Sequence, residues 1–368
     1  MDLSIVIPCL NEADTLEICI NKSLNKIEEL NIKGEIIVAD NGSSDGSIEI
    51  AQKYNVILVN VSKKGYGHAI HSGILVAKGK YVLVADADNS YDFNEIPKFY
   101  SKVINNFDLV QGCRLPSGGG KINPGAMPIS HRLIGNPFFT KLAKIFYNVP
   151  FNDIYCGMKI FKKSFYENLN YFSGGMVYNI EVLIKFYIAN ARIAEVPITL
   201  YKDGRKKSRS HLKTIPDGLK TLKFLLICSP KYLYFFPGAL IFIYSIINIL
   251  FYLINPDLVE TQKKIINCFI FLSFSIQIIM LGLFSTIISE KIGFTKKGSL
   301  EKFFNIFNIK FSLILNLGTI FSLVFLKVLN INLFHNIYND LVINFGIFIS
   351  SLILINTFFI SLLTIDGK

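Results

Sequence analysis

Long stretches without a charged side chain dominate the last third of the chain. Segments 232–254, 265–289 and 341–365 contain no Asp, Glu, Lys or Arg, and segment 311–331 is interrupted only by Lys327. Each is longer than the ~18 apolar residues that mark a helix able to cross a bilayer. A soluble helix bundle is the alternative, but soluble helices keep a polar face, which these segments lack. We therefore expect four membrane-spanning helices, at about 235–254, 265–289, 311–331 and 342–365.

The lysines beside these segments predict their orientation. The stretch 290–310 carries five lysines, whereas 330–340 carries no lysine or arginine. Short loops rich in Lys and Arg stay on the cytoplasmic side of a membrane. With four spans, we expect a multi-pass protein of the inner or plasma membrane whose two termini are both cytoplasmic.

The rest of the chain alternates between two patterns. Short apolar runs typical of buried strands cover 3–8, 35–39, 56–61 and 80–85, and helical patterns follow the first three of them. Asn11 is expected to cap the first helix, and Ser44 the second. Strands that alternate with helices predict a mostly parallel α/β sheet. We expect this domain to cover 1–236, followed by the membrane domain over 237–368.

Polar residues follow two of these strands directly. Asp86-Ala87-Asp88 leaves the fourth strand, and two carboxylates one residue apart can hold a divalent cation together with substrate phosphates. Asp40 ends the second strand and precedes an Asn-Gly turn, where a carboxylate and backbone N–H groups can receive a base or ribose. The alternative for Asp86 and Asp88 is a strand-end turn whose acids are simply solvated. The alternative for Asp40 is an ordinary Asn-Gly turn followed by a helix cap at Ser44.

Several other classes of protein lose support. The chain has no G-x-G-x-x-G and no P-loop, which disfavours dinucleotide oxidoreductases and ATPases. Its six cysteines form no C-x-x-C pair, which disfavours a zinc site or a disulfide framework. The net charge of +11 is concentrated in 200–236, with nine basic and two acidic residues. Such a segment suits an anionic membrane surface or a topology signal, and nothing resembles a nucleic-acid-reading element.

The ordered motifs resemble a known family. They are Ser4-Ile-Val-Ile-Pro-Cys-Leu-Asn-Glu-Ala13, Val38-Ala-Asp-Asn-Gly-Ser-Ser-Asp-Gly-Ser47, Lys64-Gly-Tyr-Gly67, Asp86-Ala-Asp88, Gly112-Cys-Arg114, Asp153-Ile-Tyr-Cys-Gly157, Ala194-Glu-Val-Pro197 and Asp203-Gly-Arg205. Over about 3–236 the chain resembles family-2 glycosyltransferases of the GT-A fold. Within that family it looks most like the polyprenyl-phosphate glycosyltransferases, the dolichyl-phosphate mannose synthase-like group. The resemblance implies a GT-A catalytic domain followed by transmembrane helices.

The resemblance also implies a role for individual residues. Nucleotide-sugar binding falls to Pro8, Leu10, Glu12, Asp40, Lys64, Asp86, Ala87, Asp88, Arg114 and Arg205. Asp86 and Asp88 would hold Mg²⁺ or Mn²⁺ on the donor diphosphate. Asp88, Arg132 and Asp153 would serve the reacting centre, and Arg114, Arg132, Asn136 and His211 the acceptor phosphate. In the best-known mannose synthases a glutamine two residues after D-x-D helps to bind metal, whereas this chain has Ser90, and Lys159 stands where arginine is common.

Residues near the membrane region form two amphipathic segments, about 129–147 and 213–236. In the first, Leu133, Phe138 and Ile145 are apolar while Lys141 and Lys144 are not. A helix of this kind can lie in the headgroup plane and bring a lipid phosphate toward Arg132, or it can pack on the domain core.

Taken together, the sequence predicts an inverting, metal-dependent hexosyltransferase. It would move one sugar, glucose or mannose, from a UDP- or GDP-linked donor to polyprenyl phosphate at the cytosolic membrane face, for a cell-envelope glycan. A glycolipid or glycan acceptor, or an inactive scaffold or transporter of lipid-linked sugars, is the alternative. A processive synthase is disfavoured because its Q-x-x-R-W motif needs a tryptophan, and the chain has none. A homo-oligomer is compatible with the sequence.

Overall fold

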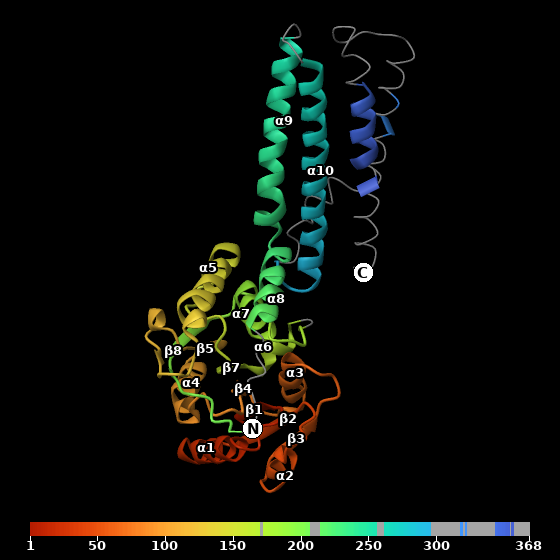
Figure 1. The fold of residues 1–368 in the computed structure, drawn as a ribbon. Helices are drawn as coiled ribbons and strands as arrows, with labels where there is room; N and C mark the ends of the chain where they lie inside the picture. The colour runs from red at the N-terminus through yellow and green to blue at the C-terminus, as the bar shows by residue number, and fades with distance from the viewer. Residues whose placement is uncertain are drawn as a thin grey trace. The chain divides into compact units, whose positions relative to one another are not determined.

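The computed structural model describes residues 1–169, 172–206, 214–255, 261–295, 317, 318, 321, 343–353, 355 and 356. The chain divides into two compact units, Met1–Leu225 and Leu226–Lys368 (Figure 1). The first unit contains the β-sheet, and the second consists of helices where it is described. The limits of the domains and of the four spans given above stay predictions.

A seven-stranded sheet forms the centre of the first unit, in the order β3-β2-β1-β4-β7-β5-β8. Its strands are β1 (Leu3–Cys9), β2 (Gly34–Asp40), β3 (Ile57–Asn60), β4 (Tyr81–Val84), β5 (Leu109–Cys113), β7 (Lys159–Lys162) and β8 (Ile193–Pro197). Strand β7 runs antiparallel to β4 and β5, and the other neighbours pair in parallel. The predicted mostly parallel α/β sheet is confirmed, and its first four strands fall on the four apolar runs.

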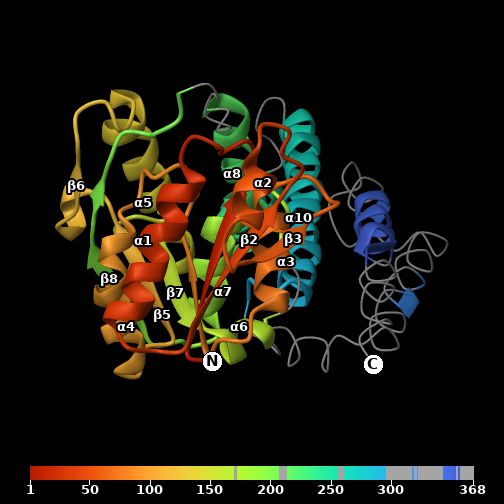
Figure 2. The same ribbon diagram turned by 90° about the horizontal axis from the view of Figure 1, so that it is seen from below.

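Helices cover both faces of this sheet, because successive side chains of a strand point to opposite faces. Leu3, Ile5 and Ile7 of β1 pack with helices α1 (Leu16–Glu29) and α4 (Ile96–Ile104). On the opposite face, Val6 lies against Gly73 of α3 (Tyr66–Val76). Helix α7 (Tyr178–Ile188) lies next to α3 (Figure 2).

Two helix starts differ from the prediction. Helix α1 begins at Leu16 and α2 (Ser47–Gln52) follows Gly46, so neither Asn11 nor Ser44 is an N-cap. Asn11 has a φ of 57° and uses its side chain to accept a hydrogen bond from the Ser44 N–H at 2.8 Å. Asn11 and Ser44 therefore connect the loop after β1 with the loop after β2, and neither begins a helix.

Several further elements belong to the first unit, and the last of them, α8, ends two residues past its boundary. They are the short parallel pair β6 (Lys121–Ile122) and β9 (Thr199–Leu200), the one-turn π-helix η3 (His131–Gly135), α5 (Asn136–Tyr147), α6 (Lys163–Glu167) and α8 (Thr214–Ile227). Elements η3 and α5 correspond to the predicted amphipathic segment.

In the second unit, α9 (Phe236–Ile254) follows the π-helical turn η4 (Lys231–Phe235) and packs along α10 (Thr261–Lys291). Segments Lys231–Ile254 and Lys264–Lys291 are long and apolar enough to cross a membrane. They coincide with the first two predicted spans. The third lies almost entirely outside the described residues, and the fourth overlaps a shorter apolar helix, Ile343–Ile353. A membrane region of more than two helices stays a prediction.

Candidate active site

The carboxyl ends of β1, β2 and β4 bring the predicted donor-binding residues to one edge of the sheet. Pro8 pairs with Ala39 and Cys9 with Asp40 across the parallel β1 and β2, and β4 leads directly into Asp86. In open α/β sheets, ligands bind just outside the carboxyl ends of parallel strands. The topology therefore places the loops that follow these three strands where a ligand is expected.

The loop after β2 is held by its own carboxylate. Asp40 is buried and accepts hydrogen bonds from the N–H groups of Gly42, at 2.9 Å, and Ser43, at 3.2 Å. Lys64 donates from Nζ to the Asn41 carbonyl oxygen at 2.6 Å, which ties the loop after β3 to the same edge. The predicted residues Asp40 and Lys64 thus belong to one connected group, with Leu10 in the neighbouring loop.

Asp86 and Asp88 leave β4 with different surroundings. Asp86 accepts a hydrogen bond from the Tyr66 hydroxyl at 2.7 Å, and burial together with the nearby charge of Asp88 raises its pKa to about 6. Asp88 accepts hydrogen bonds from the N–H of Ser90, at 3.0 Å, and from its hydroxyl, at 2.6 Å. The side chain of Ala87 between them is buried in the core. Ser90 therefore orients Asp88 through its hydroxyl.

The Asp86–Asp88 pair has the composition of a magnesium site that uses substrate oxygens. Mg²⁺ is usually held by one or two carboxylates and completes its octahedral shell with waters and phosphate oxygens. Among the described residues, no group of three or more His, Cys, Asp or Glu side chains is arranged so that it could hold a metal ion by itself. Two carboxylates next to a nucleotide-binding edge fit a cation that arrives with phosphates, and they do not make a cage built from protein alone.

Arg205 lies among three carboxylates of this edge. Its guanidinium pairs with both carboxylate oxygens of Glu12 and with Asp203, and Nη1 lies 3.6 Å from Asp88 Oδ2. Burial outweighs the effect of Arg205 on Glu12 and raises the Glu12 pKa to about 7. Predicted donor ligands from β1, β4 and the segment after β9 are thus in direct contact.

Asp153 is fully buried and holds Arg114. Arg114 donates to it from Nε at 2.7 Å, from Nη2 at 2.9 Å and from its backbone N–H at 3.0 Å. A bidentate pair of this kind fixes the guanidinium plane. Glu195 in turn accepts hydrogen bonds from Asn152, through its N–H and its side-chain amide at 2.7 Å each, and from the Asp153 N–H. The structure brings Asp153 and Arg114, which the sequence singled out separately, into direct contact, with Glu195 as their anchor.

Lys159 lies beneath the same edge as a buried cation. Its Nζ donates to the carbonyl oxygens of Cys156 and Gly157 and to Asn179 Oδ1 at 2.6 Å, and burial lowers its pKa to about 8. Among the described residues no carboxylate pairs with Lys159, but its charge interacts with that of Asp86.

The predicted acceptor residues are less closely grouped. Arg132 is exposed on η3, and Asn136 begins α5 and donates to the Met127 sulfur at 3.3 Å. Leu133, Ile134, Phe138 and Ile145 of the same two elements are exposed, between 46% and 69%. His211 lies outside the described residues.

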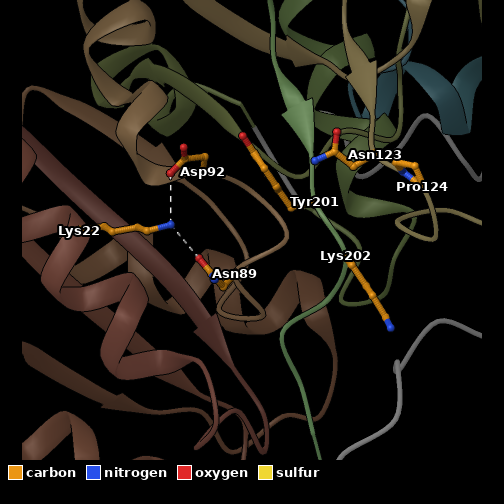
Figure 3. Close-up of a pocket in the computed structure, with 7 residues that line it drawn as sticks. All are labelled: Lys22, Asn89, Asp92, Asn123, Pro124, Tyr201 and Lys202. Atoms are coloured by element: carbon orange, nitrogen blue, oxygen red, sulfur yellow. Dashed lines mark hydrogen bonds and ion pairs between the residues drawn. The ribbon is translucent and has the colours of Figure 1, made fainter.

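A polar pocket of about 490 Å³ lies beside the site. It is lined by Lys22, Asn89, Asp92, Asn123, Pro124, Tyr201 and Lys202. Lys22 reaches Asn89 at 3.1 Å and Asp92 at 3.2 Å, as Figure 3 shows. Asn89 follows Asp88 in the chain, so the pocket borders the loop that carries the two aspartates.

Sequence reasoning missed three contacts that shape the site. Tyr66 had a signal in the Gly65-Tyr66-Gly67 run, but its partner Asp86 is 20 residues away. Glu195 and Asp203 belong to the motifs at 194–197 and 203–205, but no role for either residue follows from the sequence. Their contacts join segments that sequence spacing alone does not connect.

Comparison with known proteins shows which family the first part of the chain resembles. Residues 4–169 match Glycosyl transferase family 2. The hexosyltransferase Agl6 of low-salt glycan biosynthesis from Haloferax volcanii is 35% identical over 237 residues, which is 64% of this chain and 56% of that protein. A dolichyl-phosphate hexose transferase from the same organism is 27% identical over 197 residues, 54% of this chain and 82% of that protein.

A solved mycobacterial protein shares the fold, with a TM-score of 0.50 at 17% identity over 61% of this chain and 74% of that one. The alignment with Agl6 spans little more than half of that relative's length.

Proposed function

We propose, from the premise that residues 4–169 are a glycosyl transferase family 2 domain, that the chain transfers one hexose from a nucleotide sugar to polyprenyl phosphate. The observation that carries this proposal is one edge of the sheet: Asp86, Asp88 and Asp40 lie there, and Arg205 joins Asp88 to Glu12. Two carboxylates for a cation and an arginine beside them suit a donor whose leaving group is a diphosphate.

Asp86 and Asp88 would hold the divalent cation, Mg²⁺ or Mn²⁺. Bound there, such an ion would supply Lewis-acid stabilisation of the negative charge that develops on the departing nucleoside diphosphate. Tyr66 and Ser90 orient these two carboxylates through the hydrogen bonds described above. Asp86 must be ionised to bind metal, and its pKa of about 6 leaves it ionised at neutral pH.

The base and ribose would lie against the β1–β2 side of the edge. Asp40 and Glu12 offer carboxylates there, Pro8 and Leu10 offer the backbone that leaves β1, and Lys64 offers a cation. Arg205 would contact the diphosphate, because its planar guanidinium matches phosphate oxygens.

A lipid phosphate can attack without a strong base. Its second pKa is near 6, so the attacking oxygen is largely ionised at neutral pH. Asp153 would then act by holding Arg114 toward a phosphate through the Arg114 Nη1, which Asp153 does not bind and which donates to the Tyr91 hydroxyl at 3.5 Å. Arg132, Asn136 and His211 are the further candidates for the acceptor phosphate. A single displacement of this kind inverts the anomeric carbon.

The lipid substrate fits two features of the chain. Exposed apolar side chains of η3 and α5 give a surface suited to a headgroup layer, and Arg132 lies among them. Segments Lys231–Ile254 and Lys264–Lys291 suit an anchor in the bilayer, and we place the catalytic unit and both termini on the cytosolic side. The similarity to a dolichyl-phosphate hexose transferase supports the same acceptor class.

A glycolipid or glycan acceptor is the second candidate. The relative named for glycan biosynthesis is a hexosyltransferase, and that name leaves the acceptor open. Both candidates predict hexose transfer, and they differ in whether a lipid phosphate without any sugar can serve as the acceptor.

Incubation of the purified full-length chain with Mg²⁺, a short polyprenyl phosphate and labelled UDP- and GDP-hexoses tests the proposal. We expect label from one donor to enter the organic phase, and Asp88→Asn to abolish this transfer. Glu17→Gln, which changes an exposed acid on α1, is the matched control and should keep activity. Lipid-borne label from no donor would contradict the proposal.

A further inference from the structure

The segment 201–206, which carries Arg205, is fastened across two loops of the candidate site. The Tyr201 N–H donates to the Ser90 carbonyl oxygen at 2.9 Å, and the Gly204 N–H donates to the Asp88 carbonyl oxygen at 3.0 Å. At the other end, the Lys206 N–H donates to Asp14 Oδ2 at 2.8 Å. The segment thus bridges the loop after β4 and the loop after β1.

Gly204 allows this close approach. A Cβ atom at Gly204 would lie 2.8 Å from Thr15 Cγ2 and 3.4 Å from the Asp88 carbonyl oxygen. A larger residue would push the segment away from both loops. The position of Arg205 is therefore set by backbone contacts as well as by its charge.

Arg205 supplies a positive charge where the proposed reaction needs a divalent cation. The Arg205 side chain is 9% exposed, binds both oxygens of Glu12 and lies 3.6 Å from Asp88. A divalent cation on Asp88 would meet a like charge at short range between two largely buried side chains, where charge repulsion is strong. The diphosphate of a nucleotide offers Arg205 a new anionic partner and removes this conflict.

We propose that Arg205 and the divalent cation compete for Asp88, so that the site takes up metal together with a nucleoside diphosphate rather than metal alone. The inference rests on the proposed function, in which Asp86 and Asp88 are the metal ligands. In this proposal Arg205 both contacts the diphosphate and sets the order of binding. By linkage, nucleotide must tighten metal binding by the same factor as metal tightens nucleotide binding.

Equilibrium dialysis of Mn²⁺ against the full-length chain tests the competition without any need for turnover. Bound Mn²⁺ is measured with no nucleotide, with UDP and with GDP. For the wild type we expect weak binding of Mn²⁺ alone and clear binding with one nucleotide. Arg205→Gln removes the charge, and we expect it to bind Mn²⁺ alone at least about tenfold more tightly, which is about 1.4 kcal/mol. Nucleotide should then tighten Mn²⁺ binding less than it does in the wild type.

Two variants guard against a trivial result. Arg205→Lys keeps the positive charge, so it should bind Mn²⁺ weakly without nucleotide, as the wild type does. If Arg205→Lys and Arg205→Gln both bound Mn²⁺ alone more tightly than the wild type, the competition would be contradicted. Arg192→Gln makes the same charge change at an exposed arginine beside Asp108, which precedes β5 at the opposite, amino-terminal edge of the sheet. It should leave Mn²⁺ binding unchanged.

Asp88→Asn separates failure of the inference from failure of the proposed function. If Asp88→Asn loses nucleotide-dependent Mn²⁺ binding and Arg205→Gln behaves as the wild type, the competition is wrong and the metal site stands. If Asp88→Asn binds Mn²⁺ as the wild type does, or if no variant binds Mn²⁺ with either nucleotide, the assignment of the metal ligands is wrong and the inference falls with it.

Discussion

The contact between Tyr66 and Asp86 shows how a single hydroxyl shapes the site. Asp86 is raised in pKa by burial and by Asp88, and the Tyr66 hydroxyl opposes this by donating to its ionised form. Loss of the donor would favour the protonated acid and free the carboxylate to rotate, and both effects weaken a metal ligand.

We therefore predict that Tyr66→Phe weakens Mn²⁺ binding in the presence of nucleotide by about tenfold. A hydrogen bond to a charged group contributes about 1.5 kcal/mol, which is a factor of that size. Tyr54→Phe is the matched control, because Tyr54 donates to Glu17 at an exposed place on the surface. Equal affinities for the wild type and Tyr66→Phe would show that Tyr66 does not orient a metal ligand.

Glu12 gives a pH dependence whose sign follows from its burial. Burial raises the pKa of Glu12 from its ordinary value of 4.5 to about 7, so the folded chain binds a proton more tightly than the unfolded chain. Stability from Glu12 is fully present below pH 4.5 and is lost as pH rises to about 7.

Thermal unfolding of the wild type and Glu12→Gln between pH 4.5 and 7.5 measures this contribution. We expect the advantage of the wild type over Glu12→Gln to shrink across that window, because glutamine does not ionise. A difference that grows with pH would contradict the raised pKa.

The amino end of α3 is the element that places Tyr66. The N–H groups of Gly67 and His68 donate to the Gly174 carbonyl oxygen, at 2.8 and 3.2 Å. A Cβ atom at Gly67 would lie 2.1 Å from the Ser173 carbonyl oxygen, a distance that backbone cannot accept.

Gly67→Ala should destabilise the fold by about 1–3 kcal/mol, the usual cost of overpacking, because the 173–174 backbone must move. Gly175→Ala is the control, since a Cβ atom there meets nothing within 4 Å. Chemical denaturation of both variants gives their free energies of unfolding. Similar losses of stability in Gly67→Ala and Gly175→Ala would mean that α3 does not need its close contact with the 173–174 backbone.

At the same scale, the sequence predicts strands better than it predicts the contacts between loops. Strands β1 and β4 are buried throughout and β2 over its last five residues, so each appears as a continuous apolar run that can be recognised locally. The parallel edge strand β3 is mostly half-buried, but its sequence is also apolar. Asn11 and Ser44 have the composition of helix caps, but they bind each other across 33 positions of the chain. Strand β7 has lysines at both ends and an antiparallel place between β4 and β5, and no local pattern indicates that insertion.

The site follows the same rule. Asp40, Asp86 and Asp88 were predicted because they directly follow recognisable strands. Arg205 and Asp153 were assigned only through resemblance to a family, since their positions in the site depend on long-range packing. The pairing of Arg205 with Glu12 spans 193 positions, and only the folded chain shows it.

For the whole molecule, the proposed function needs both a donor site and access to a lipid. The exposed apolar side chains of η3 and α5 belong to the catalytic unit, while the two long apolar helices belong to the second unit. Binding of a lipid acceptor should depend on the exposed apolar side chains of η3 and α5, even when the two long apolar helices anchor the chain in the membrane.

We predict that the double variant Leu133→Ser, Phe138→Ser raises KM for polyprenyl phosphate several-fold and leaves KM for the nucleotide sugar unchanged. Each lost side chain removes apolar contact worth about 1–2 kcal/mol when buried in a bilayer interface. Leu75→Ser alters an equally exposed leucine on α3 and should change neither constant. Steady-state kinetics with each substrate varied in turn distinguishes these outcomes, and an unchanged lipid KM in the double variant would remove η3 and α5 from acceptor binding.

The nature of the acceptor is the central claim, and a comparison of acceptors tests it most directly. With the active donor and Mg²⁺, the full-length chain is offered polyprenyl phosphate, the matching polyprenol and a polyprenyl-linked glycolipid, and the products are identified by mass spectrometry. We predict a single hexose added to polyprenyl phosphate and no product from the other two. Hexose added to the glycolipid, with polyprenyl phosphate left unmodified, would contradict the account.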